Sequence, residues 1–417
     1  MRDWPRTGDA FRPVVTGIGV VAPNGIGVDA FWSALIEGRS GVVPITHFDA
    51  SKLRTRIAGE VRGFEPRHHL PPDVKWRRMA RHTQFALAAM EMALRDAGLT
   101  KADFATCPAF ITMGVSTSAI EICEDTIDTC RLGHTDHLRP WLVWASQPNA
   151  VPVTLAEYLG AQLPSLAVST ACKAGLDALI EAVDIVRNGR AELVIAGGAD
   201  APITASTFAS FDTTRMLSQR NDDPAHASRP FDRDRDGGII SEGAGVVVIE
   251  SLAHARARGA RVWLELCGGA SRPDPCGSPD ATGMSDAMTL ALANASRRPE
   301  DIDYISAHGP SHPVIDGVES SGIRKVFGRH ADRIPVSSIK GVIGNPLAAA
   351  GPLQAIACAL SMRHDLIPPT ANYTTPDPAC DLDYVPQARR GRMHCALINV
   401  HGMGGGNSCV VVKRSEI

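Results

Sequence analysis

The stretch VSTACKAGLDALIEAVDIVRNG, residues 168–189, changes from a short β-type run to a helical pattern at Cys172. Small residues surround the cysteine, because Ala171 precedes it and Ala174 and Gly175 follow it. They are expected to let the first turn of the helix pack tightly against other backbone. A thiol at a helix N-terminus experiences the positive end of the helix dipole, which favours the thiolate, and the amides of that turn can bind an oxyanion. Taken alone, the stretch fits a nucleophile and a buried structural cysteine about equally well.

A second stretch repeats this pattern later in the chain. IPVSSIKGVIGNPLAAAGPLQAIACALSMRHD, residues 334–365, contains V-S-S where the first stretch has V-S-T, then a few connecting residues and a small-residue helix that ends on basic residues. A predicted helix and a predicted strand precede each stretch: residues 85–98 and 109–116, then residues 284–296 and 301–309. Self-similarity of this kind indicates a duplicated unit. We therefore expect two similar halves, residues 1–255 and residues 256–417.

Apolar runs alternate with helical stretches along the whole chain, which is typical of an α/β fold. The helix predicted at 85–98 ends on Gly98, a natural C-cap. The runs that we predict as further strands are PVVTGIGVVA (13–22), ELVIAGGAD (192–200), GAGVVVIES (243–251) and HCALINVHGMGGG (394–406). The fold class predicted from the pattern is therefore α/β.

The composition limits the class of protein. The 417 residues carry a formal net charge of −3, which argues against nucleic acid as a partner. With 44% hydrophobic residues, the chain still has no apolar run as long as a membrane span, and its N-terminus has no signal-peptide pattern. We expect a soluble, cytoplasmic protein without a membrane partner. The ten cysteines form no C-x-x-C pair, so neither a disulfide framework nor a metal site is expected.

Other polar residues stand at the ends of predicted strands and helices. His308 ends an apolar strand, and Lys340 and Asn345 precede the small-residue helix of the second half. Residues 401–407, HGMGGGN, are rich enough in glycine to require a special turn with free backbone amides. Each signal alone also fits a structural histidine, a surface lysine or a helix cap. Together with Cys172 they indicate an active site.

In these stretches the chain resembles the β-ketoacyl synthases, the condensing enzymes of fatty-acid and polyketide synthesis, and among them the stand-alone fatty-acid and type II polyketide enzymes. The matching stretches are VVTGIGVVAPNGIGVDAFWSALIEGRSGV (14–42), VSTACKAGLDAL (168–179), ASRPFDRDRDGGIISEGAGVVVIE (227–250), AHGPSHPVIDGVES (307–320), VSSIKGVIGNPLAAAG (336–351) and VHGMGGGN (400–407). The resemblance implies a five-layered αβαβα thiolase-like fold made of two similar halves. It also implies a homodimer, or a heterodimer with a related ketosynthase-like subunit.

Carried over by position, the resemblance implies a role for each candidate residue. Cys172 accepts an acyl group from a carrier-protein thioester, and its amide and that of Met403 form an oxyanion hole. His308 stabilises the enolate that forms when a malonyl-type extender loses carbon dioxide. Lys340 organises the site electrostatically, and Glu319 holds the segment around His308 in place. No metal or cofactor is implied, because the phosphopantetheine arm of the acyl carrier protein serves as the handle of the substrate.

Three departures from the family's pattern stand out. Asn345 replaces a second histidine, and an amide can donate a hydrogen bond to an enolate oxygen but cannot act as a base. Pro310 and His312 occupy positions where threonine hydroxyls usually bind the pantetheine arm. His401 and Met403 replace two phenylalanines of the glycine-rich loop, and His401 is a candidate extra base near the nucleophile. His312 and His401 fit a surface residue and a buried structural residue equally well.

We therefore predict a ketosynthase of specialised biosynthesis that elongates by decarboxylative Claisen condensation. The alternative is a ketosynthase-fold enzyme that loads an acyl chain and then transfers or cyclises it without elongation. A non-catalytic partner subunit that controls chain length fits less well, because such subunits usually lack the cysteine. One surface is a candidate docking site for an acidic carrier protein, although a solvated helix face explains it as well. Its residues are Lys75, Arg77, Arg78 and Arg81.

Overall fold

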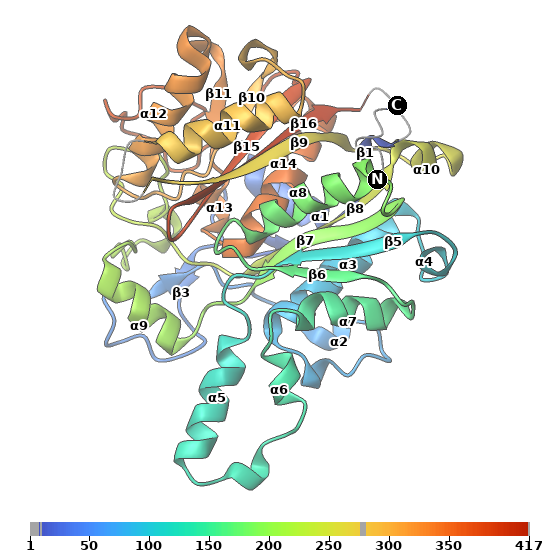
Figure 1. The fold of residues 1–417 in the computed structure, drawn as a ribbon. Coiled ribbons are helices and arrows are strands. Elements are labelled where there is room, and N and C mark those ends of the chain that lie inside the picture. The colour runs from blue at the N-terminus through green and yellow to red at the C-terminus, as the bar shows by residue number, and fades with distance from the viewer. Residues whose placement is uncertain (1–7, 9–10, 276–280, 416–417) are drawn as a thin grey trace.

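The computed structural model describes residue 8 and residues 11–275 and 281–415, which form an α/β fold (Figure 1). The strands of the first half lie in the order β6 (Ser165–Val168), β5 (Ala109–Gly114), β7 (Leu193–Asp200), β8 (Gly243–Ser251) and β1 (Pro13–Ala22). Those of the second half lie in the order β11 (Pro335–Ser337), β10 (Tyr304–Ser306), β15 (Cys395–Gly402), β16 (Gly406–Arg414) and β9 (Leu264–Pro273). A short pairing of β1 with β9 joins the two sets into one sheet.

The two sets of strands repeat one topology. In the first set, β1, β8 and β7 are antiparallel neighbours, and β7, β5 and β6 are parallel. In the second set, β9, β16 and β15 are antiparallel, and β15, β10 and β11 are parallel. This repetition confirms the expectation of two similar halves. The predicted boundary between residues 255 and 256 falls inside α10 (Leu252–Ala257), which connects β8 to β9, and it stays a prediction.

Helices form three layers around these strands (Figure 1). The helices of the layers are α3 (Arg81–Ala97), α7 (Ala150–Leu159), α8 (Ala174–Arg187), α14 (Ala350–His364), α11 (Thr282–Asn294) and α12 (Ile315–Phe327). The first two pack on the outer face of the first set of strands, and α11, with α12 against it, covers the second set. Helices α8 and α14 contact each other and strands of both sets, so they form a middle layer. The order of layers is αβαβα, as expected.

The remaining elements are short or lie at the periphery. The other helices are α1 (Val28–Ile36), α2 (Pro66–His69), α4 (Asp103–Thr106), α5 (Ile120–Arg131), α6 (Leu142–Ala145), α9 (Ala205–Thr214) and α13 (Lys340–Ile343). The other strands are β2 (Gly25–Ile26), β3 (Val43–Pro44), β4 (Ile57–Ala58), β12 (Leu366–Ile367), β13 (Asp383–Tyr384) and β14 (Arg389–Arg390). Within the described ranges, the helices include none that is long and apolar enough to cross a membrane.

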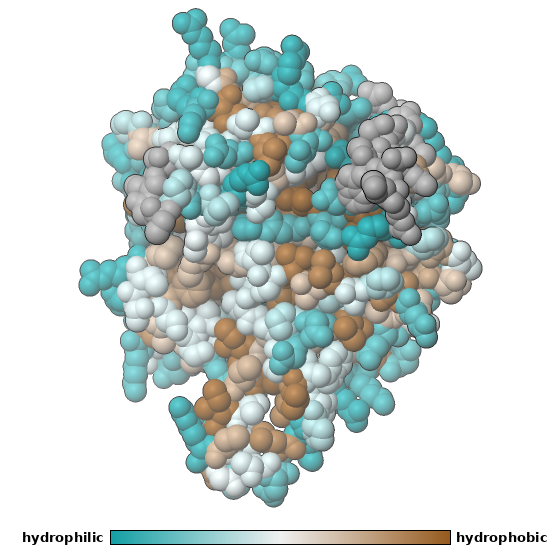
Figure 2. Space-filling model, in the orientation of Figure 1, coloured by the Kyte–Doolittle hydropathy of each residue, from teal (hydrophilic) through white to brown (hydrophobic). Residues whose placement is uncertain are grey.

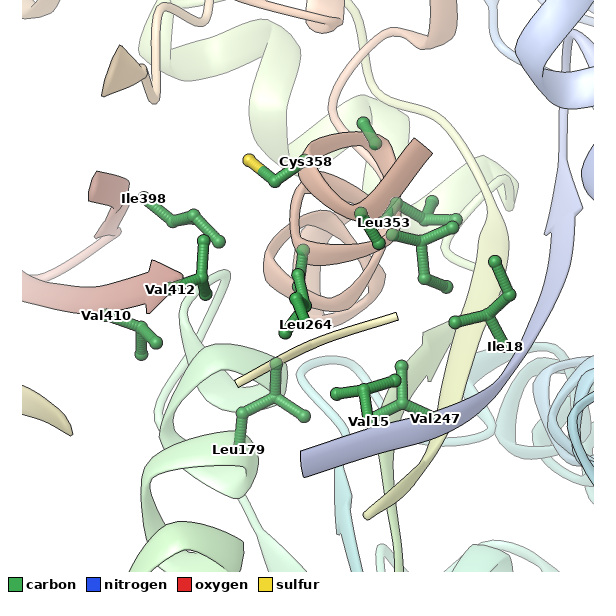
Figure 3. Packing of buried hydrophobic residues seen from close by; sticks show 14 of the residues in the cluster. Val15, Ile18, Leu179, Val247, Leu264, Leu353, Cys358, Ile398, Val410 and Val412 are labelled. Atoms are coloured by element: carbon green, nitrogen blue, oxygen red, sulfur yellow. The ribbon is translucent and has the colours of Figure 1, made fainter. Parts of the chain in front are cut away.

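The core between the two sets of strands surrounds α14. Every residue from Ala350 to Met362 is buried, so this helix has no polar face, as expected for a helix covered on all sides. Each large apolar side chain buried in this way contributes about 1.5–3 kcal/mol to folding. The cluster drawn in Figure 3 contains side chains from both halves: Val15, Ile18, Leu179, Val247, Leu264, Leu353, Cys358, Ile398, Val410 and Val412.

At the start of α8 the backbone of the first half packs directly against residues of the second half. A Cβ atom on Gly175 would lie 2.0 Å from the carbonyl oxygen of Ala348 and 2.7 Å from the ring of Pro352. A Cβ atom on Gly198, at the end of β7, would lie 2.2 Å from the same carbonyl oxygen. These distances leave no room for a methyl group. The small residues beside the cysteine therefore pack against backbone, as the sequence predicts.

We expect Gly175→Ala to lower the free energy of unfolding by about 3 kcal/mol, because the added methyl group forces α8 away from the carbonyl of Ala348. Urea and thermal unfolding measure this change. Gly317→Ala in α12 is the matched control, since its nearest neighbours would lie 3.8 Å from the new Cβ. Alanine at this helical position is expected to raise stability by about 0.5–1 kcal/mol. Equal stabilities of the two variants would contradict the close approach described above.

Candidate active site

Segments that follow β6, β10 and β11 meet the β15–β16 turn around one open cavity. Six residues predicted for the site line this cavity: Cys172, His308, His312, Asn345, His401 and Met403. Most of the remaining wall is apolar and is built by Phe211, Met216, Leu217, Ile239, Ile240, Ile315 and Leu347. A largely apolar cavity with a few convergent polar groups is typical of a ligand site.

Cys172 lies in the connection between β6 and α8, one residue before the helix cap at Lys173. The preceding Ala171 has a φ of 58°, a left-handed conformation that costs a non-glycine residue about 1 kcal/mol or more. Burial raises the pKa of the Cys172 thiol, while the amide of Met403 and the charge of Lys340 act in the opposite direction. The helix dipole was expected to favour a thiolate. Because Cys172 is buried, desolvation opposes this effect and favours the protonated thiol.

His308 follows β10 and is held through its backbone. Its amide and that of Gly309 donate to the two carboxylate oxygens of Glu319 at 2.8 and 2.7 Å. The ammonium group of Lys340 donates to the carbonyl oxygen of His308 at 2.6 Å. Burial raises the pKa of Glu319 and lowers that of Lys340 to about 8. Burial and the Lys340 charge also lower the pKa of His308 well below its ordinary value, so its imidazole is neutral.

Asn345 lies in the loop between α13 and α14. Its backbone amide donates to the carbonyl oxygen of Ile239 at 2.7 Å, and its carbonyl oxygen accepts from the amide of Ser241 at 3.0 Å. The side-chain oxygen of Asn345 is buried and has no hydrogen-bond partner among the residues that the structure describes. The Nδ1 atom of His308 has none within the same residues. Both side chains can therefore bind a substrate group that enters the cavity.

His312 is half-buried in the cavity wall and caps the start of α12. Its Nδ1 accepts hydrogen bonds from the amides of Val314 and Ile315 at 3.1 and 3.3 Å. In the neutral ring the proton is therefore on Nε2. Burial lowers the pKa of His312, which keeps the ring neutral. His312 thus presents a hydrogen-bond donor rather than a charge.

The β15–β16 hairpin contributes His401 and Met403. The amide of Met403 faces the sulfur of the nucleophile, whereas about half of the residue is exposed to solvent. His401 Nδ1 lies 2.9 Å from Asn407 Oδ1, and the centre of its ring lies 5.9 Å from that of His308. The turn uses two residues with left-handed φ angles, Gly404 (90°) and Gly405 (81°). The special turn predicted from the glycine-rich sequence is therefore present.

The predicted basic cluster is only partly exposed. Lys75, Arg77 and Arg78 lie on the surface around a 3₁₀ turn. The guanidinium group of Arg81, in contrast, donates to both carboxylate oxygens of the buried Glu242, at 2.8 and 2.7 Å. Arg81 therefore does not belong to the exposed cluster with which the sequence grouped it, because this ion pair holds it against the protein.

Sequence reasoning missed three polar residues near the site. Asp200 ends β7 and accepts hydrogen bonds from the amides of Thr117 and Ala348 at 2.9 and 2.8 Å, and burial raises its pKa to about 6. Asp200 stands at the end of an apolar strand, and this position could have identified it from the sequence. Asn407 and Asp274 stand behind His401, with Asn407 Nδ2 2.7 Å from Asp274 Oδ1. Nothing in the sequence links residue 274 to residue 407.

Comparison with known proteins assigns the chain to a family. The model of the β-ketoacyl synthase N-terminal domain matches residues 12–255, and that of the C-terminal domain matches residues 269–374. A putative polyketide β-ketoacyl synthase 1 of Streptomyces halstedii is 43% identical over 97% of this chain and 98% of its own. A 3-oxoacyl-[acyl-carrier-protein] synthase 2 of Synechocystis sp. is 38% identical over 97% of this chain and 98% of its own.

Solved structures agree with this assignment. The ishigamide ketosynthase/chain length factor has a TM-score of 0.91 and is 33% identical, over 97% of this chain and 99% of its own. A type II polyketide ketosynthase in complex with its acyl carrier protein has a TM-score of 0.89 and is 33% identical, with the same coverage. The chain belongs to the β-ketoacyl synthase family and has its thiolase-like fold. It is a ketosynthase, an acyltransferase of the condensing type.

Proposed function

We propose that this ketosynthase elongates an acyl chain by decarboxylative condensation in a specialised, polyketide-type pathway. The observation that carries the proposal is that Cys172, His308 and Asn345 line one apolar cavity, with the amide of Met403 directed at the sulfur. The names of the relatives, which are polyketide and fatty-acid synthases, support the substrate class.

In the loading step, Cys172 Sγ attacks the carbonyl carbon of a carrier-bound thioester. The carbonyl oxygen becomes an oxyanion, and the amides of Met403 and Cys172, which both face the sulfur, donate hydrogen bonds to it. Donors of this kind each contribute about 10²–10³ in rate. The carrier thiol leaves, and the acyl group stays on Cys172 along the apolar wall. Capture on the sulfur divides one difficult reaction into two easier ones.

In the condensation step, a malonyl-type extender loses carbon dioxide and leaves an enolate. His308 is neutral and donates a hydrogen bond to the enolate oxygen, and the Asn345 amide is the second donor. Lys340 adds a positive charge behind His308, where it is fixed to the carbonyl oxygen at 2.6 Å. The enolate carbon then attacks the acyl carbon, and the Cys172 sulfur is released.

The pantetheine arm of the carrier protein is the handle that brings each substrate to the cavity, and we propose no metal or other cofactor. Pro310 offers no side-chain donor in the wall. The Nε2–H of His312, which lines the same wall, takes the place of the missing threonine hydroxyls and binds an amide oxygen of the arm. The nine cysteines that the structure describes are unpaired, which supports a reducing, cytoplasmic location. Cys276 lies outside the described residues.

Incubation with an acyl thioester is expected to add one acyl group to Cys172, as measured by the mass of the intact protein. Cys172→Ala should abolish the adduct, because it removes the nucleophilic sulfur. Cys123→Ser is the matched control, since Cys123 is an exposed free cysteine on α5, and it should leave the adduct intact. No adduct on the wild type, or an adduct that survives Cys172→Ala, would contradict the proposal.

The loaded enzyme is expected to release carbon dioxide from a malonyl-carrier protein and to form an acyl chain longer by two carbons. Loading without release of carbon dioxide would instead support the enzyme that transfers or cyclises its acyl group. The two outcomes are separated by labelled carbon dioxide and by the mass of the product on the carrier protein.

The exposed cluster of Lys75, Arg77 and Arg78 is proposed as the docking surface for the acidic carrier protein. Reversing the charge with Arg77→Glu and Arg78→Glu should slow loading from a carrier-bound thioester by about tenfold, because complementary charges accelerate association. Loading from a small thioester should not change. If both substrates slow equally, the cluster does not act in docking.

A second ketosynthase-type subunit is proposed to cover β6 and the arm formed by α5 and α6. β6 ends the sheet, and the arm stands away from the body of the molecule (Figure 1). Unpaired strand edges and exposed apolar patches are typical of interfaces. Figure 2 shows apolar surface on the arm, and the exposed apolar residues of the arm and β6 are Ile127, Leu132, Val143, Trp144 and Leu166.

The variant with Leu132→Asp and Val143→Asp is expected to weaken association of the subunits by at least about tenfold, because both side chains are more than 70% exposed in the single chain, at 71% and 74%. Sedimentation measures the change, and Thr213→Asp on α9 is the surface control. A wild-type chain that remains monomeric alone would exclude an identical partner and leave a related subunit to be identified by co-expression.

A further inference from the structure

Behind His401, three polar side chains form one hydrogen-bonded series. His401 and Asn407 face each other across the β15–β16 pair, and His401 Nδ1 lies 2.9 Å from Asn407 Oδ1. Asn407 Nδ2 donates to Asp274 Oδ1 at 2.7 Å. The backbone amide of Asp274 donates to the carbonyl oxygen of Gly405, which fixes Asp274 to the same hairpin. The second carboxylate oxygen of Asp274 lies 3.8 Å from His401 Nδ1.

The direction of these hydrogen bonds fixes the proton of the His401 ring. A carboxylate only accepts, so Asn407 turns its NH₂ group to Asp274 and its oxygen to His401. His401 Nδ1 must then donate, which leaves Nε2 with a free lone pair. When Nε2 takes up a proton, the carboxylate of Asp274 compensates the positive charge. The series therefore prepares Nε2 as a proton acceptor, as an orienting group does in catalytic triads.

The other imidazoles of the cavity are less suited to accept a proton. Burial lowers the pKa of both His308 and His312. The charge of Lys340 acts in the same direction on His308, and that of Arg235 does so on His312. Other charged groups packed against the hairpin, among the described residues, include Lys173, its ion-pair partner Asp177, and Arg272, which pairs with Asn407 in the β9–β16 ladder. His401 is the imidazole of this cavity with a carboxylate behind its ring.

Cys172 needs such an acceptor. Burial raises the pKa of its thiol, which favours the protonated sulfur. Asn345 stands where the family's pattern has a second histidine, and its amide cannot take up a proton. His401 reaches the same cavity as Cys172 from a different element of the fold.

We propose that His401 is the base that activates Cys172, an imidazole supplied by the hairpin in place of the one absent at residue 345; this rests on the acyl transfer proposed above. As Cys172 Sγ forms its bond to the thioester carbon, the thiol proton moves to His401 Nε2. Collapse of the tetrahedral intermediate breaks the bond to the carrier sulfur, which takes the proton from Nε2. The ring is neutral before and after the transfer, so protons and charge balance.

The test compares acyl loading of the wild type, His401→Phe and His401→Gln between about pH 5.5 and 9.5, with a small acyl thioester and intact-protein mass as the readout. Phenylalanine keeps a planar ring and glutamine keeps a donor, but neither takes up a proton. Near pH 7 both variants are expected to load about 10²-fold more slowly than the wild type. The difference in loading rate between the wild type and the variants should narrow only at the alkaline end of this range, because burial raises the pKa of the Cys172 thiol and the thiolate forms without a base only there.

His226→Gln is the matched control, because His226 also pairs with a carboxylate, that of Asp223 at 2.8 Å, but is exposed and lies outside the cavity wall. It should load at the wild-type rate. Asp274 is a positioning residue, and its variants test whether the hydrogen bonds from Asp274 through Asn407 to His401 prepare the His401 ring. Asp274→Asn can donate as well as accept and removes the negative charge, so it should load about tenfold more slowly near pH 7, as should Asp274→Ala.

Loading of His401→Phe at the wild-type rate near pH 7, or pH profiles that superimpose, would overturn the inference. If the wild type itself forms no acyl-Cys172, the proposed function fails instead. Alkylation of Cys172 by iodoacetamide, which needs the thiolate but no acyl substrate, then tests the base alone. Slower alkylation of His401→Phe near pH 7 supports the role of His401, and equal rates overturn it.

Discussion

The site depends on the contact between the start of α8 and the backbone just before α14. Gly175 and Gly198 allow the carbonyl of Ala348 to approach so closely that a Cβ atom at either position would overlap with it. Asp200 strengthens the same contact, because its buried carboxylate binds the amide of Thr117 in one half and that of Ala348 in the other. Cys172 belongs to the first half and Asn345 to the second. They share a cavity because the glycines at the start of α8 and the end of β7 let the backbone before α14 pack directly against the first half.

Burial sets the protonation states around this contact. It raises the pKa of the Cys172 thiol and of Glu319, and it lowers the pKa of His308 and Lys340. All four groups are thereby shifted toward their neutral forms, and hydrogen bonds to backbone decide where each one points. The carboxylate of Glu319 accepts hydrogen bonds from the consecutive amides of His308 and Gly309, and these bonds fix the segment that carries His308. Hydrogen bonds to the backbone therefore fix the positions of these groups, and burial away from water sets their pKa values.

The fold could be predicted from the sequence because duplication leaves a visible pattern. The V-S-T and V-S-S runs, the small-residue helices and the Gly98 cap all mark elements that the structure contains. Cys172, His308 and Asn345 could be named because each one follows a strand or precedes a helix, whereas His312, His401 and Met403 were named from the resemblance to the family. The pairing of Arg81 with Glu242 could not be foreseen, because it joins residues 161 positions apart. The same holds for Asp274 and Asn407, whose contact exists only once β9 and β16 lie side by side.

The β15–β16 hairpin carries both the Met403 amide that faces the sulfur and the His401 ring that lines the cavity. They are two residues apart, and Asp274 is hydrogen-bonded to the hairpin that carries them through the side chain of Asn407 and the carbonyl oxygen of Gly405. A small molecule that bound beneath this turn and displaced it would move both the oxyanion-hole amide of Met403 and the His401 ring away from Cys172.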